Sequence, residues 1–179
     1  LEEIDLMKPK QCLISALQLS VHPENYLKQL MKKQVTAIAV DFIRDTEGDY
    51  PFVRCMSEIA GNTVVLIAAE HLSNINGGKG LMLGGVTGVP PTEVVVLGAG
   101  TVGEFAARAA LGLGSSVKVF DNSLQKLSRM QNDIGQRLYT STLHPEIFAT
   151  ALENSDVVIG PSRSKKDRAP ILLTEERVS

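Results

Sequence analysis

A glycine-rich turn between a β-branched run and an apolar helical stripe is the feature that most constrains the fold of this chain. The turn reads Gly98-Ala99-Gly100-Thr101-Val102-Gly103 and directly follows the run Val94-Val95-Val96-Leu97. In such a pattern the first glycine makes the tight turn, the second lets the backbone approach a pyrophosphate, and the third allows close packing of helix on strand. The pyrophosphate lies on the free N–H groups at the helix N-terminus. We therefore expect Gly98, Gly100, Thr101, Val102 and Gly103 to form a dinucleotide-binding turn.

A carboxylate stands at the spacing from this turn that dinucleotide binding requires. Asp121 ends the next apolar run, 23 positions after Gly98. There it can accept hydrogen bonds from both hydroxyls of an adenosine ribose and repel a 2′-phosphate, which favours NAD over NADP. Lys118 and Lys126 are expected to offset part of that repulsion. Two alternatives stay open: glycines that serve packing alone, and an FAD or S-adenosylmethionine site built on the same turn.

The alternation of apolar patterns along the chain predicts an α/β fold. Strands are expected at residues 12–17, 36–40, 94–97, 117–120, 138–140 and 156–159, and helices after Pro23 and Ser123 and at 101–113 and 145–152. Residues 56–74 are ambiguous, and their length favours one helix over a strand at 64–69. Alternating strands and helices predict a Rossmann-type, doubly wound parallel sheet. We expect a dinucleotide-binding domain at 55–179, with its core at 92–160.

The first 54 residues predict a strand-helix-strand piece of a second α/β domain. Tyr26, Leu27, Leu30 and Met31 are expected to form the buried stripe of its helix, and residues 36–40 to be a buried strand. Asp41 directly follows that strand.

Composition and charge exclude several classes of partner. The net charge is −2 and the pI about 5.9, so nucleic acid and anionic membrane surfaces are not expected partners. The longest run without charged residues or His, residues 80–92, is shorter than the roughly 18 residues of a membrane span. Cys12 and Cys55 stand far apart, and His22, His71 and His144 share no metal-ligand spacing. These features indicate a cytoplasmic protein without a metal site or a disulfide framework.

A second glycine block precedes the turn. Eleven of the fifteen glycines lie between Gly77 and Gly114, and residues 77–91 hold six of them among apolar side chains. The block is either a flexible connector or a hinge close to the ligand, since bare backbone suits both.

Several motifs occur together in the order found in one known family. They are Cys55-Met56-Ser57-Glu58-Ile59-Ala60-Gly61, the block 77–91, the turn 98–103 and Asp121. Over nearly its whole length the chain resembles the alanine dehydrogenase and nicotinamide nucleotide transhydrogenase family, and Met-Ser-Glu-Ile-Ala-Gly favours the alanine dehydrogenase branch. The resemblance implies a cytosolic homo-oligomer, typically a hexamer, that oxidatively deaminates L-alanine to pyruvate and ammonia with NAD.

The resemblance also implies roles for individual residues. Asp121 and Lys126 would hold the adenosine ribose, Ser57 and Ser141 would lie near the cofactor, and Ile159 would pass beside the nicotinamide. The family's catalytic histidine falls on Gln18 in this chain. A glutamine amide can hydrogen-bond a substrate but cannot carry a proton at neutral pH, so Gln18 is either a substrate-binding residue or one that satisfies local hydrogen bonds.

Other catalytic residues of the family belong upstream of Leu1 and downstream of Ser179, so the chain is expected to be an internal fragment. We expect it to bind NAD(H) without alanine-dependent NADH production. Two further hypotheses are the NAD(H)-binding subunit of a proton-translocating transhydrogenase and a non-catalytic dinucleotide-binding module. The segment 161–168 is expected to be a solvated basic loop, and a helix to begin near Thr174.

Overall fold

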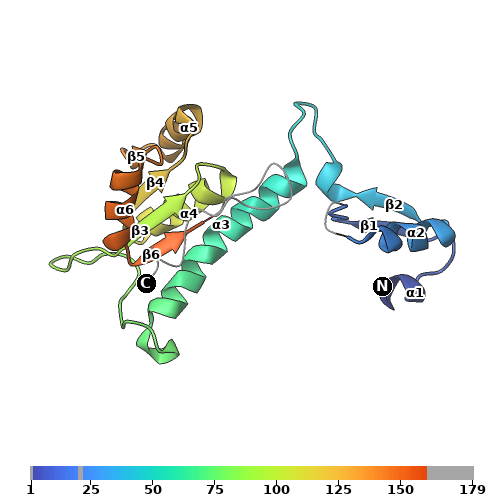
Figure 1. The fold of residues 1–179 in the computed structure, drawn as a ribbon, viewed down its shortest axis with the longest axis horizontal. Helices are drawn as coiled ribbons and strands as arrows, with labels where there is room; N and C mark the ends of the chain where they lie inside the picture. The colour runs from blue at the N-terminus through green and yellow to red at the C-terminus, as the bar shows by residue number, and fades with distance from the viewer. Residues whose placement is uncertain (1, 20–21, 161–179) are drawn as a thin grey trace. The chain divides into compact units, whose positions relative to one another are not determined.

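A computed structural model of the protein describes residues 2–19 and 22–160 (Figure 1). The chain divides into two units, Leu1–Met56 and Ser57–Ser179. The loop expected at 161–168 and the helix expected from Thr174 lie outside the described residues.

Unit 2 is built on a parallel sheet whose strand order is β5-β4-β3-β6. The strands are β3 (Glu93–Leu97), β4 (Ser116–Phe120), β5 (Tyr139–Ser141) and β6 (Val157–Ile159). The chain moves outward from β3 through β4 to β5 and then returns to place β6 on the other side of β3. This reversal is the topological switch point at which open α/β sheets bind their ligands. The predicted doubly wound parallel sheet is confirmed.

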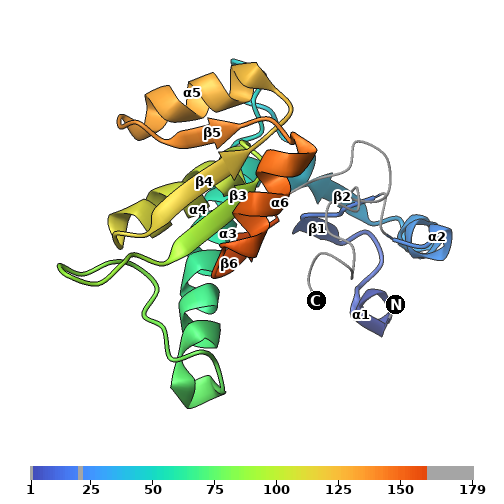
Figure 2. The same ribbon diagram turned by 60° about the vertical axis from the view of Figure 1, so that its left-hand side comes forward.

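Helices cover both faces of this sheet (Figure 2). They are α3 (Pro51–Leu72), which begins in unit 1, and α4 (Thr101–Gly112), α5 (Leu124–Ile134) and α6 (Pro145–Glu153). The first three share one buried cluster with Val94, Val96, Val117 and Val119. On the opposite face α6 packs through Phe148 and Ala151 against Val95, Leu97 and Phe120. The strand residues thus alternate between two cores, as the near-continuous apolar runs of a parallel sheet require.

A glycine sets how closely α3 approaches α4. A Cβ at Gly61 would lie 2.5 Å from the carbonyl oxygen of Val102 and 2.7 Å from the Cβ of Phe105. Val65 and Leu72 continue the same face of α3 into the core. The apolar segment at 56–74 is therefore one helix, as its length predicted, and Gly61 in its interior is explained by packing.

By length and composition, α3 also meets the requirement for crossing a membrane. It has 22 residues and a mean hydropathy of 1.4 in its most apolar window. Core helices of soluble proteins share these properties, so length and composition alone do not distinguish the two kinds of helix. Here one face of α3 packs in the core of unit 2 through Gly61, Val65 and Leu72.

Two glycines of the block 77–91 pack at the far end of α4 from the glycine-rich turn. A Cβ at Gly84 would overlap the carbonyl oxygen of Leu113, and one at Gly85 would lie 2.5 Å from that of Gly114. The N–H of Gly84 donates to Thr92 Oγ1 at 2.8 Å. This part of the block is not a flexible connector, because Gly84 is bonded to Thr92 directly before β3 and the N–H of Gly85 donates to the carbonyl oxygen of Leu113, in the segment that leads into β4, at 3.1 Å. The expectation of a hinge close to the ligand stays a prediction.

Unit 1 contains the predicted strand-helix-strand piece. Its elements are α1 (Glu2–Leu6), β1 (Cys12–Ser15), α2 (Glu24–Lys32), β2 (Thr36–Ala39) and the short 3-10 helix η1 (Val40–Phe42), with β1 and β2 parallel. The expected burial was wrong at two places: Met31 is 76% exposed, and β2 is exposed except for its last residue. Two strands with so few helices do not form a closed core, so apolar side chains on the open faces remain in solvent.

Candidate functional site

The fold itself explains two glycines of the turn that follows β3. Gly98 has a φ of +136°, which L side chains rarely adopt. A Cβ at Gly103 would overlap the carbonyl oxygen of Gly98, so this glycine lets α4 lie against the end of the strand. Both residues would be needed in any protein that turns this sharply from strand to helix.

Gly100 is different, because the fold gives no reason for a glycine there. Its φ of −87° and ψ of −176° are extended values open to any residue, and a Cβ would meet nothing within 4 Å. Directly after it, the first N–H groups of α4, those of Thr101 and Val102, have no intrahelical acceptor. The positive end of the helix dipole adds to their attraction for an anion. The turn therefore leaves open space over main-chain donors, which suits a phosphate group.

Asp121 lies one residue after β4 and faces this turn. Its Oδ2 accepts a hydrogen bond from the N–H of Ala99 at 2.9 Å, and its Oδ1 accepts one from the N–H of Ser123 at 2.8 Å. The side chain is 15% exposed. Each carboxylate oxygen has two acceptor positions, so capacity remains for further donors. The structure brings together the glycine-rich turn and the spaced acid that the sequence singled out.

Lys126 and Ser141 also lie beside Asp121. Ser123 caps α5, its Oγ accepting from the N–H of Lys126 at 3.4 Å, and the Nζ of Lys126 is 4.0 Å from Asp121 Oδ2. Ser141 is the last residue of β5, and its carbonyl oxygen accepts from the N–H of Asp121 at 3.2 Å. The carboxyl ends of β3, β4 and β5 thus place these side chains at one edge of the sheet.

Lys118 does not take part, contrary to expectation. Its Nζ is 2.8 Å from Glu93 Oε2, and Glu93 is the first residue of β3. This ion pair lies at the end of β3 away from Gly98. Lys118 is therefore not available to offset the charge of Asp121.

Arg129, which the sequence analysis did not single out, does reach the turn. Its Nη2 donates to the carbonyl oxygen of Ala99 at 3.4 Å. The available signal was the spacing of Lys126 and Arg129, because residues three apart on a helix share a face. Which strand-end loop that face meets depends on the packing of α5, and the sequence does not show it.

Ser57 and Ile159 lie at more distant parts of unit 2. Ser57 is half-buried on α3, one helical turn before Gly61, which contacts Val102. Ile159 is the last residue of β6 and pairs with Val96. Its side chain is only 4% exposed and belongs to the core, so only its main chain can face a ligand.

Gln18 belongs to unit 1, where Asp41 organises the loop after β1. The N–H groups of Leu17 and Gln18 donate to Asp41 Oδ1 and Oδ2 at 3.1 and 3.2 Å. Gln18 has a φ of +40°, a strained value for a side chain of this kind. Asp41 therefore stabilises the backbone conformation that presents an exposed Gln18.

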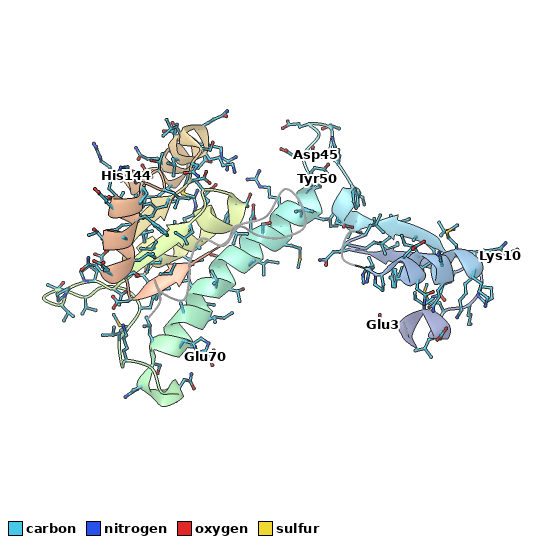
Figure 3. The ribbon with its side chains drawn as sticks, in the orientation of Figure 1. Glu3, Lys10, Asp45, Tyr50, Glu70 and His144 are labelled. Atoms are coloured by element: carbon cyan, nitrogen blue, oxygen red, sulfur yellow. The ribbon has the colours of Figure 1, made fainter. Side chains whose placement is uncertain are left out.

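The three histidines are surface residues. His144, labelled in Figure 3, is the N-cap residue of α6, His22 stacks on Tyr26 with ring centroids 4.2 Å apart, and His71 is exposed in the last turn of α3. Within residues 2–19 and 22–160, no group of three or more His, Cys, Asp or Glu side chains is placed to hold a metal ion.

Comparison with known proteins connects this geometry to a family. The family model described as alanine dehydrogenase/PNT, C-terminal domain, matches residues 64–179, and the corresponding N-terminal domain model matches residues 1–60. The chain belongs to the alanine dehydrogenase/PNT family. The resemblance seen in the sequence is confirmed.

The relatives of this alanine dehydrogenase/PNT chain include curated alanine dehydrogenases. It is 35% identical over 176 residues to that of Methanococcus maripaludis and 37% identical over 180 residues to that of Mycolicibacterium smegmatis. The matches cover 98% and 99% of this chain and 47% of each relative. The chain thus spans about half the length of the curated relatives it matches.

Solved structures agree. An L-alanine dehydrogenase superposes with a TM-score of 0.88 at 37% identity, covering 99% of this chain and 49% of that one. A transhydrogenase from Sinorhizobium meliloti superposes with a TM-score of 0.80 at 20% identity, covering 99% of this chain and 51% of the other. At that identity the second likeness shows a shared fold alone.

Proposed function

We propose that this chain is the NAD(H)-binding portion of an alanine dehydrogenase-like oxidoreductase. In the intact enzyme the reaction would convert L-alanine and NAD to pyruvate, ammonia and NADH. The observation that carries the proposal is the open space at Gly100, where an added Cβ would meet no protein atom within 4 Å. This space lies beside the N-terminus of α4 and close to Asp121, which follows β4. The names of the relatives support the same reaction class.

Each residue of the site then has a definite task. The N–H groups of Thr101 and Val102 bind the pyrophosphate, and Gly98, Gly100 and Gly103 let the backbone approach it. Asp121 accepts the ribose hydroxyls. NAD supplies the hydride acceptor, and the chain supplies binding and orientation.

Four further residues are assigned from the family resemblance. Lys126 approaches the ribose end, and Ser57 and Ser141 lie near the cofactor. The main chain at Ile159 passes beside the nicotinamide. A small amino acid is the substrate of the intact enzyme.

The charge of Asp121 makes NAD the preferred cofactor over NADP. A 2′-phosphate carries close to two negative charges at neutral pH, and it would replace the hydroxyl that the carboxylate accepts. The remaining acceptor capacity of Asp121 suits two hydroxyl donors, which a phosphorylated ribose does not offer.

Calorimetry of the purified chain with NADH tests the proposal. We expect binding by the native chain and a loss of about tenfold or more in Gly100→Ala, because the new methyl occupies the open side of the turn. Gly112→Ala is the matched control, since its Cβ also meets nothing within 4 Å but lies at the other end of α4. A folded chain that does not bind NADH would overturn the proposal.

The NAD(H)-binding subunit of a transhydrogenase is the second candidate, and Gln18 is the observation that favours it. An amide in place of the family's histidine removes the proton carrier that amino-acid oxidation needs, whereas hydride transfer between two nucleotides needs none. Hydride transfer from NADH to an NADP analogue by the intact protein, with no response to alanine, would favour this candidate.

We also propose that the protein is a homo-oligomer, with a hexamer as the form that the family resemblance favours. Ile59, Leu66 and Ile67 form an exposed apolar stripe on α3, opposite the face that holds Gly61 and Val65. Because a twofold axis brings identical surfaces together, an uncharged stripe can pack on its own copy. Light scattering should show assembly in the native chain, dissociation in Leu66→Lys, and no change in Gln125→Lys on α5.

A cytosolic location completes the proposal. Cys12 and Cys55 are both free and exposed, as is usual for proteins of reducing compartments. Cell fractionation with a tagged full-length protein tests this, and recovery with the membrane fraction would contradict it.

A further inference from the structure

The main chain of Ala99 connects two side chains of opposite charge. Its N–H donates to Asp121 Oδ2 at 2.9 Å, and its carbonyl oxygen accepts from Arg129 Nη2 at 3.4 Å. One residue of backbone therefore separates the carboxylate from the guanidinium, and both groups lie against the same turn.

Two cations, Lys126 and Arg129, lie against the turn that Asp121 faces. Lys126 Nζ lies 4.0 Å from Asp121 Oδ2, so Asp121 has one cation beside it and a second across Ala99. Arg129 has one other charged partner, since its Nε is 3.8 Å from Asp133 Oδ2. That pair is about half exposed on both sides, and exposed pairs of this kind are weak.

The guanidinium keeps donors for a ligand. An arginine carries five N–H donors, and the contacts with Ala99 and Asp133 occupy a minority of them. The side chain is 55% exposed, so the guanidinium is open to a ligand while it holds the carbonyl oxygen of Ala99. Arginine binds phosphate oxygens in a bidentate manner, which an ammonium group does not.

We propose that Arg129 is a specificity-determining residue that, together with Lys126, binds a 2′-phosphate on the adenosine ribose, so that this site accepts NADP(H) as a weaker second cofactor. The proposal rests on the proposed function, because it places the ribose at Asp121. Asp121 still favours the unphosphorylated ribose, and Arg129 reduces the difference in affinity between NAD(H) and NADP(H). Lys118, the other candidate cation, is paired with Glu93 and does not contribute.

A purely structural role of Arg129 makes a different prediction. If the guanidinium only holds the carbonyl of Ala99, its removal disturbs the turn for every dinucleotide alike. NADH and NADPH would then lose affinity by the same factor. The ratio of the two affinities therefore separates the two roles.

The experiment is calorimetric titration of the native chain and three variants with NADH and with NADPH at fixed salt. Arg129→Gln should weaken NADPH binding about five- to tenfold while NADH changes less than twofold, as expected for one charge-assisted contact at an exposed site. Arg129→Lys should retain part of the NADPH affinity. Arg137→Gln, an exposed arginine in the loop between α5 and β5, controls for net charge and should leave both affinities unchanged.

The outcomes are distinguishable. An equal loss for both nucleotides, no change in either, or NADH binding without measurable NADPH binding to the native chain would overturn the role of Arg129 and leave the proposed function standing. Failure of the native chain to bind either nucleotide would overturn the proposed function and this inference with it. Thermal unfolding of each variant verifies that the fold is retained.

Discussion

The carboxylate of Asp121 accepts a hydrogen bond from the main-chain N–H of Ala99 at 2.9 Å, which joins the end of β4 to the glycine-rich turn after β3. The residue expected to select the cofactor therefore also supports the loop that would cradle its phosphates. Its second oxygen holds the N–H of Ser123, the residue that caps α5. Asp121 therefore contributes both to the shape of the site and to its charge.

Two substitutions at Asp121 separate these effects. Asp121→Ala leaves the N–H groups of Ala99 and Ser123 without their acceptor, and we expect a loss of about 1–3 kcal/mol in the free energy of unfolding. Asp121→Asn keeps one acceptor oxygen and removes the charge, so it should cost less stability but narrow the preference for NADH over NADPH. Urea unfolding and calorimetry measure the two quantities. An unchanged NADH to NADPH ratio in Asp121→Asn would show that the carboxylate charge does not select the cofactor.

Gly103 and Gly100 should respond oppositely to an added methyl group. Gly103→Ala places a Cβ on the carbonyl oxygen of Gly98 and should destabilise the protein by at least about 2 kcal/mol. Gly100→Ala adds a methyl that meets nothing, so its stability should stay within about 1 kcal/mol of the native value. Thermal unfolding of the two variants decides this. Equal destabilisation would mean that Gly100 is retained for the fold and not for a ligand.

The contact between α3 and α4 depends on Gly61. Gly61→Ala gains helix propensity, but its Cβ would lie 2.5 Å from the carbonyl oxygen of Val102, and we expect a net loss of about 1–3 kcal/mol. Gly112→Ala has open space in the last turn of α4 and should instead stabilise by up to about 1 kcal/mol. Chemical denaturation measures the sign of the change in the free energy of unfolding for both variants. A stabilised Gly61→Ala would show that the two helices separate at little cost.

Asp41 should control the loop that carries Gln18. Asp41→Ala removes the acceptor for the N–H groups of Leu17 and Gln18, so hydrogen exchange at these two amides should become faster. Gln18→Gly relieves the positive φ and should stabilise the loop by about 0.5–1 kcal/mol. Unchanged exchange rates at both amides in Asp41→Ala would contradict the role of Asp41 in stabilising this loop.

Binding and turnover should be separable in this chain. We expect it to bind NADH and to show no alanine-dependent NADH production, because it spans about half the length of the alanine dehydrogenases it matches and carries Gln18 where the family has its catalytic histidine. An absorbance assay with alanine and NAD measures turnover. Turnover by the purified chain would contradict this prediction.

Local sequence patterns were sufficient for most of the elements. Ser123 marked the start of α5 and Pro23 the start of α2, and both helices begin one residue later. The alternation of strand and helix predicted the parallel sheet, because a parallel connection requires a crossover. Burial in unit 1 was not predictable in the same way. The apolar pattern of β2 predicts a strand that can be buried, but within the described residues β2 is exposed except for its last residue.

Contacts between elements could not be predicted from the sequence. Nothing in the spacing of Lys118 and Lys126 shows that one pairs with Glu93 and the other approaches Asp121. The two lysines stand on different elements, so their partners depend on strand register and on the rotation of α5. Register and helix rotation are set by side-chain packing over the whole core.

By itself the sequence determined the family, the class of fold and the turn that would meet a dinucleotide, because these depend on local periodicity and on glycines at short, fixed spacing. Only the tertiary structure decided that Gly98 and Gly103 serve the fold while Gly100 faces open space, and that Arg129 reaches Ala99. The physical reason is that a glycine's purpose and a cation's partner are properties of the space around them. That space exists only once β3, β4 and α5 have packed together.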